Sequence, residues 1–153
     1  MENIEEFDAA FQELSTQLVE IAFEYVGYNK EEVNTIYIFG SIEANVYLFS
    51  VFYRINNELV NINEVNKVSV QQYDISNKSM MALLSRGNKI LVRVDRLFEK
   101  LGEDVPTVLK MIYKPGTEEL DFEFDYELQY SNDEVKIAAD ISKEWFNELK
   151  KAE

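Results

Sequence analysis

The sequence predicts a single α+β domain, spanning residues 1–153, in which helices cover an antiparallel sheet of four to five strands. Three observations carry this prediction. The predicted order is helix, two or three strands, a pair of helices, two strands and a helix. Strands grouped as hairpins between helices, without βαβ alternation, are typical of this class. At 153 residues the chain has the size of one domain, with no internal repeat or low-complexity segment.

The N-terminal segment 3–26 has the spacing of an amphipathic helix. Apolar residues recur at steps of three and four from Phe7 to Tyr25, so they share one helix face. Gly27 is suited to end the helix. We expect the apolar face to pack on the molecule's own sheet, because tertiary burial supplies most helical stability.

Two segments that follow, 35–41 and 45–55, are rich in β-branched and aromatic residues and predict strands. The second has almost no polar break, which favours a central strand covered on both faces. A third short strand is expected at 59–62, and 63–75 shows no period and is interpreted as an irregular connection.

A central pair of helices is expected at about 77–86 and 88–101, with Asp74 and Ser76 as N-cap candidates and Gly87 as the break between them. Basic residues form a row along one side of these helices at steps of three and four. We call this row the basic stripe: Arg86, Lys89, Arg93, Arg96 and Lys100. It is either a solvated helix face, whose long side chains also cover apolar surface, or a docking patch for phosphate or for an acidic surface.

The C-terminal part predicts a hairpin followed by a helix. A strand at 108–113 leads into Pro115-Gly116, which suits the middle of a type II turn. The segment 120–128 then alternates apolar and acidic residues without a break, as expected of a strand with one dry and one charged face. Apolar steps of three and four predict the closing helix from Ala138 onward.

The charged face of this strand is the main candidate site. Its carboxylates stand about 6.5–7 Å apart along one side of a strand. The predicted carboxylate row consists of Asp121, Glu123, Asp125 and Glu127. It is either a solvated surface or a binding site for a basic partner.

Composition excludes several classes of chemistry. The chain has no Cys, and it has no His, so Cys–His and Ser–His catalysis and the commonest metal ligands are absent. Five scattered glycines offer no phosphate loop. We therefore expect no catalytic, cofactor or metal site. A formal charge of −14 also argues against direct binding to nucleic acid or to an anionic membrane.

Two metal sites were weighed as alternatives. The carboxylate row could ligate a hard cation, but a flat strand face is a poor cage. Asp125 with Glu134 and Lys136 is similar to the acidic-and-lysine set of some metal-dependent nucleases, although Glu-x-Lys is common in charged chains.

The acidic N-terminus and the absence of a long apolar run favour a cytoplasmic protein.

The C-terminal half, about residues 90–150, contains five short motifs: Val105-Pro106-Thr107, Lys110-Met111-Ile112-Tyr113, Asp121-Phe122 to Tyr126, Ala139-Asp140-Ile141 and Glu144-Trp145-Phe146. Through these motifs this part of the chain resembles the YezG-like immunity proteins of Gram-positive bacteria. The resemblance implies an antitoxin that binds and neutralises a secreted toxin, often a nuclease. It implies no catalytic residues, and structural roles for Pro106, Thr107, Tyr113, Tyr126 and Trp145.

The leading hypothesis is a non-enzymatic immunity protein whose acidic surface binds one basic toxin domain. Acidic residues of the first helix are a second candidate surface for that partner: Glu13, Glu20 and Glu24, with Glu5 and Glu6. A homodimer is left open. The alternative is a small-ligand or regulatory module with an aromatic pocket between sheet and helices, for which 13% aromatic residues provide material.

Overall fold

The computed structural model describes residues 2–43, 45–127, 129 and 137–152. This part of the chain contains four α-helices, one short 3₁₀ helix and five strands. In chain order they are α1 (Glu2–Tyr25), β1 (Val33–Glu43), β2 (Val46–Ile55), β3 (Glu58–Asn61), η1 (Ile62–Glu64), α2 (Val65–Val68), α3 (Asn77–Leu101), β4 (Val108–Lys114), β5 (Glu119–Asp125) and α4 (Ala138–Lys151). The predicted α+β class is confirmed.

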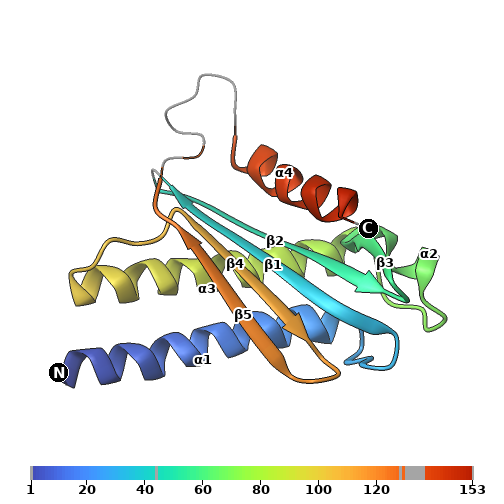
Figure 1. Cartoon of the computed structure of the whole chain (residues 1–153), viewed down its shortest axis with the longest axis horizontal. Helices are drawn as coiled ribbons and strands as arrows, with labels where there is room; N and C mark the ends of the chain where they lie inside the picture. The colour runs from blue at the N-terminus through green and yellow to red at the C-terminus, as the bar shows by residue number, and fades with distance from the viewer. Residues whose placement is uncertain (1, 44, 128, 130–136, 153) are drawn as a thin grey trace.

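The strands form one antiparallel sheet in the order β3-β2-β1-β4-β5 (Figure 1). β1 pairs with β2 from Val33 to Glu43 and with β4 on its other side. The two edges are β3, with four residues, and β5, with seven. β5 is therefore the longer open edge of the sheet.

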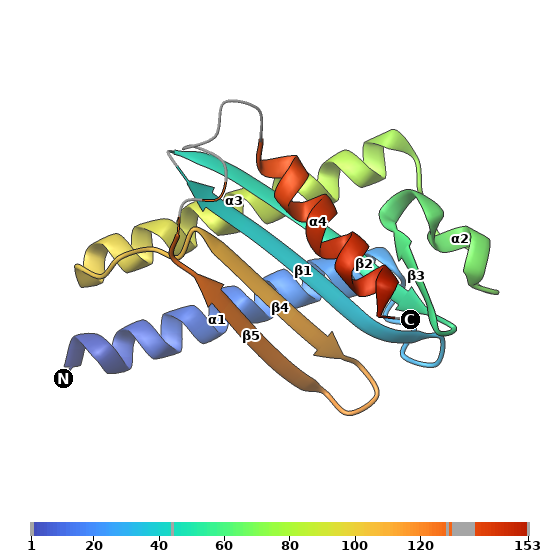
Figure 2. The same ribbon diagram turned by 45° about the horizontal axis from the view of Figure 1, so that its top comes forward.

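Helices lie on both faces of the sheet. α1 and α3 run side by side on one face, and α4 crosses β1 and β2 on the other (Figure 2). Ile36 and Ile38 of β1 belong to the core beneath α1 and α3, whereas Tyr37 and Phe39 pack against α4. Because both faces of β1 are covered, its central residues from Ile36 to Phe39 are apolar without a break instead of alternating.

α1 packs through its predicted apolar face on the molecule's own sheet. Leu18 and Ala22 are fully buried, and the Tyr53 hydroxyl of β2 donates to the Ala22 carbonyl at 2.7 Å. The helix ends at Tyr25, and Gly27 has a φ of 59° in the left-handed region. The expected packing and the expected glycine terminus are both confirmed.

The expected break between two central helices is wrong. α3 is continuous from Asn77 to Leu101, with Ser76 as its N-cap. A Cβ on Gly87 would lie 2.1 Å from Cγ of Phe49 on β2, so glycine permits close approach of helix and strand. Gly87 is a packing residue in the middle of the helix instead of its end.

The β4–β5 hairpin is confirmed, but its turn is not type II at Pro115-Gly116. Glu118, and not Gly116, has the positive φ, at 61°. Its amide donates to the Lys114 carbonyl at 2.7 Å, which closes a loop with Pro115, Gly116, Thr117 and Glu118 between the strands. The following strand is shorter than predicted and ends at Asp125, while Leu128 lies outside the described residues.

Trp145 anchors α4. Its ring packs edge-on against Tyr37 and Phe52, with centroid distances of 5.8 and 5.7 Å. The Lys110 ammonium of β4 lies 5.2 Å from the centre of the same ring. These contacts hold α4 over β1 and β2, and β5 at the edge of the sheet is not covered by this helix (Figure 2).

Among the described residues, no helix has both the length and the apolarity that crossing a bilayer requires.

Candidate partner-binding surface

The carboxylates of β5 lie on the sheet face that carries α4. Cross-strand pairing shows this, because Tyr37 pairs with Ile112 and Ile112 with Asp121, and paired residues point to the same face. We call this set the β5 acidic row. It consists of Glu119, Asp121, Glu123 and Asp125, all exposed.

The row differs from the sequence prediction at both ends. Glu119 joins it, because β5 begins there. Glu127 leaves it, because the strand ends at Asp125 and the Glu127 amide instead donates to the Asp125 side chain at 2.9 Å. Thr107 holds this end of the strand, since its amide donates to the Asp125 carbonyl at 2.7 Å and its hydroxyl donates to the Glu127 carbonyl at 2.6 Å.

The β5 acidic row is only weakly compensated. Two lysines of β4 stand opposite it in the register, Lys114 beside Glu119 and Lys110 beside Glu123. Neither forms a salt bridge with it in the described part of the chain, and Lys110 is directed over the ring of Trp145. Four carboxylates therefore stand in a line beside two lysines, and no salt bridge joins the two sets among the described residues.

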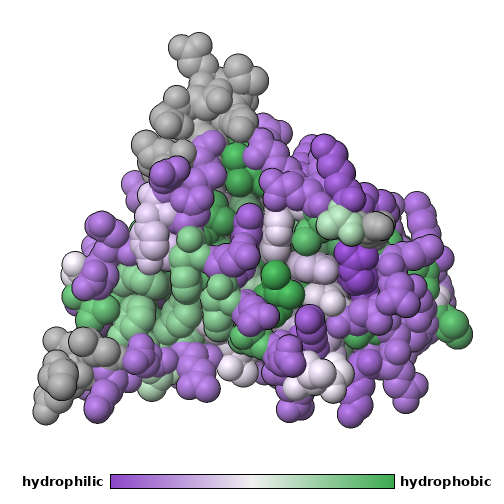
Figure 3. All heavy atoms as spheres, in the orientation of Figure 1, coloured by the Kyte–Doolittle hydropathy of each residue, from purple (hydrophilic) through white to green (hydrophobic). Residues whose placement is uncertain are grey.

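The opposite face of β5 is not the dry face that alternation predicted. Phe122, Phe124 and Tyr126 are 37%, 42% and 55% exposed. The cause is the edge position of β5, where α1 contributes Phe11 at ring distances of 5.7 Å from Phe122 and 6.0 Å from Phe124. Figure 3 shows hydrophobic surface gathered over β5 and the neighbouring part of α1.

The second candidate surface, on α1, is compensated by α3. The two helices run antiparallel, as the contacts of Phe7 with Phe98 and of Glu24 with Arg86 require. Glu24 and Arg86 form a salt bridge at 3.4 Å between half-exposed side chains. A pair of this kind contributes about 0.2–1 kcal/mol.

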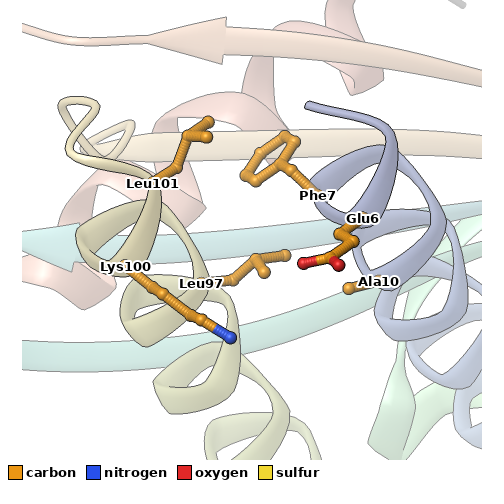
Figure 4. Close-up of a pocket in the computed structure, with 6 residues that line it drawn as sticks. All are labelled: Glu6, Phe7, Ala10, Leu97, Lys100 and Leu101. Atoms are coloured by element: carbon orange, nitrogen blue, oxygen red, sulfur yellow. The ribbon is translucent and has the colours of Figure 1, made fainter. Parts of the chain in front are cut away.

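Further along the same interface, acidic residues of α1 again lie near basic residues of α3. Glu20 shares a cleft of about 350 Å³ with Lys89 and Arg93. At the far end, Glu6 and Lys100 project from facing helices into a cleft of about 320 Å³ (Figure 4). Glu13 lies on the α1 side that carries Glu6 and Glu20, by its spacing of seven residues from each. Four residues of the basic stripe, Arg86, Lys89, Arg93 and Lys100, therefore lie next to acidic residues of α1.

Concave sites are shallow in the described structure. The cleft between α4 and β2 measures about 480 Å³ and is lined by Phe52 and Phe146 together with Ser142, Lys143 and Asn147. It is the counterpart of the aromatic pocket in the alternative hypothesis. Three of its polar residues belong to α4, and Ser50 of β2 and Asn61 of β3 supply the others.

The metal-dependent nuclease alternative finds no support in the described residues. They contain no group of three acidic side chains placed to hold a metal ion. Glu134 and Lys136 lie outside the described residues, so only Asp125 of that set is placed.

A scan against models of protein families and a search of curated proteins gave no match to this chain.

Proposed function

We propose that this chain is a non-enzymatic immunity protein that binds and neutralises a basic protein toxin, a nuclease domain, through the surface of β5. The observation that carries the proposal is the β5 acidic row, which is exposed and forms no salt bridge in the described part of the chain, whereas the acids of α1 face the basic stripe. The resemblance of the C-terminal half to immunity proteins supports the same class of partner.

The chemistry of such an interaction is straightforward. A nuclease presents cationic side chains where it binds the phosphates of its substrate. A regular line of carboxylates on a strand can form ion pairs with those cationic side chains in place of the substrate's phosphates. Complementary charge raises the association rate and disfavours wrong partners. Phe122 and Phe124, exposed on the opposite face of the same edge strand, supply apolar contact area to a partner that contacts both faces of the edge.

The test is co-expression with basic nuclease domains encoded in the source genome, beginning with the product of the neighbouring gene. The toxin alone is expected to arrest growth, and the pair is expected to grow. With purified proteins, the chain should inhibit nucleic-acid cleavage at stoichiometric concentration. A toxin that stays fully active in the presence of excess chain contradicts the proposed function.

A charge-reversed variant locates the interface within that test. Replacing Asp121, Glu123 and Asp125 with Lys should weaken toxin binding by more than tenfold at low salt and reduce its salt dependence. The matched control replaces Glu13, Glu20 and Glu24 with Lys and should have a smaller effect. Equal affinity and equal salt dependence for the β5 variant would mean that its carboxylates are only a solvated face.

The cleft between α4 and β2 supports the second candidate, a small-ligand module. A ligand there would contact Phe146 and Lys143, and Phe146→Ala should abolish its binding without affecting toxin inhibition. The shallow form of the cleft makes this the weaker candidate.

A further inference from the structure

The outer edge of β5 is available for strand pairing. β5 pairs with β4 on one side, from Glu119 opposite Lys114 to Asp125 opposite Val108. On its other side no strand of the described chain is hydrogen-bonded to it. Alternate backbone N–H and C=O groups of an edge strand point outward and can pair with an added strand.

The two faces of β5 have sharply different chemistry. The β5 acidic row lies on the face with α4, and Leu120, Phe122 and Phe124 lie on the face with α1. Directly opposite side chains of paired strands share a face and interact. A strand added to β5 would therefore place one set of its alternating residues beside carboxylates and the other set beside aromatic rings.

We propose that β5 is a docking edge for an extended basic segment of a partner protein, which adds to the sheet as a sixth strand. Lys or Arg at alternate positions of that segment would lie beside the β5 acidic row, and apolar residues between them would lie against Phe122 and Phe124. That the partner is a toxin rests on the proposed function. The mode of binding rests on the geometry of β5.

The charges select this occupant over a second copy of the chain. Antiparallel pairing of two β5 strands about a two-fold axis would keep each face continuous. Carboxylates of one copy would then stand opposite carboxylates of the other, an arrangement that destabilises strand pairs. A basic segment replaces that repulsion with attraction while making the same backbone hydrogen bonds.

The aromatic side extends the surface beyond the strand itself. Phe11 of α1 lies between β5 and α3, with its ring 6.0 Å from both Phe124 and Phe98. Apolar side chains of an added strand would thus meet a continuous group of rings instead of isolated exposed residues. An added strand would therefore make apolar contacts with several rings on one face of β5 and electrostatic contacts with carboxylates on the other face.

The experiment uses the isotope-labelled full chain and a synthetic peptide of alternating lysine and valine, as long as β5. Amide chemical shifts are expected to change along Glu119–Asp125, with new protection of outward amides from exchange. A control peptide of the same composition, with lysines and valines in separate blocks, should bind more weakly. Shift changes spread over α1 and β5 alike would overturn the proposal, because they indicate unspecific charge attraction.

Two further peptides test strand pairing directly. They carry N-methyl groups either on the lysine amides or on the valine amides. Only every second amide of an added strand points toward β5, so one peptide should keep the affinity of the parent and the other should lose it. Equal effects of the two methylation patterns, whether retention or loss, would overturn strand addition.

Paired variants identify the face that selects the segment. Asp121→Asn with Glu123→Gln should weaken binding of the alternating peptide by roughly three- to thirtyfold. Glu13→Gln with Glu20→Gln removes the same charge from α1 and should leave the affinity within about twofold. The proposal is overturned if the α1 pair has the larger effect.

The two proposals can fail separately. Peptide binding at β5 without toxin inhibition would contradict the immunity function and leave the docking edge. Toxin inhibition with indiscriminate peptide binding would leave the immunity function and remove strand addition.

Discussion

Gly87→Ala tests the packing of α3 against the sheet. An added methyl group would lie 2.1 Å from Cγ and 2.2 Å from Cδ2 of Phe49, where carbon atoms normally approach to about 3.5–4.0 Å. Phe49 is 1% exposed and has no room to retreat without leaving its place in the core. The helix and strand must separate by more than about 1 Å, or the ring must move.

The expected magnitude is a balance of two effects. Alanine improves helix propensity over glycine by about 1 kcal/mol. Overpacking a filled core costs about 1–3 kcal/mol, and this severe overlap belongs at the upper end. We therefore expect a net loss of about 2 kcal/mol, which in a chain of this size corresponds to a fall in Tm of about 4–8 °C.

Urea unfolding followed by circular dichroism measures the effect, and a second background isolates its cause. In Phe49→Ala the ring is absent, so alanine at position 87 should stabilise the chain by about 1 kcal/mol relative to glycine. Gly116→Ala is the matched control, because nothing lies within 4 Å of its added Cβ. The reasoning is refuted if Gly87→Ala is as stable as the parent, or loses equally in both backgrounds.

Three further predictions concern stability. Backbone and side-chain donors led by the Val70 amide lower the pKa of Glu32 to about 2, so its ionised form stabilises the fold fully above pH 4.5 and loses that effect as pH falls toward 2. Glu32→Gln should therefore lower Tm most at neutral pH, with a gap that closes on acidification; a gap independent of pH would contradict this. Ser15→Ala should raise stability by about 1 kcal/mol, because the Ser15 hydroxyl is buried without a hydrogen-bond partner in the described structure; a lower urea midpoint would indicate an unseen partner. Burial, with a smaller effect of Asp74, raises the pKa of Tyr25 to about 12, so its contribution falls as pH rises above 10; Tyr25→Phe should flatten this alkaline loss of Tm, and an unchanged alkaline slope would count against the assignment.

The sequence predicted most elements because they are periodic. Steps of three and four between Phe7 and Tyr25 define α1 whatever it packs against, and the apolar run of β2 indicates a strand covered on both faces. Gly87 was misinterpreted because a helical glycine usually marks an end. Its actual role depends on Phe49, which is distant in the sequence and was not assigned to that contact.

The candidate site was predicted only in part. Alternation places carboxylates and rings on opposite faces of β5, but it does not state whether either face is covered. Exposure of Phe122 follows from the order of strands in the sheet, which leaves β5 at an edge. Compensation of Glu20 and Glu24 follows from the position of α3 beside α1. Both are tertiary facts that no local pattern contains.

The two interpretations of the acidic row, a solvated surface or a binding site, are consequences of one arrangement. An edge strand with exposed aromatic residues pairs readily with another copy unless charge opposes it. The carboxylates of β5 supply that opposition, since a second β5 would bring like charges together. The same charges attract a basic strand, so protection from self-association and selection of a basic partner need no separate residues.

Neutralising the β5 acidic row should therefore have two joint effects. The alternating basic peptide should bind more weakly, and self-association, measured by analytical ultracentrifugation, should increase. A neutralised variant that loses peptide affinity but stays monomeric at high concentration would separate the two effects and contradict this account.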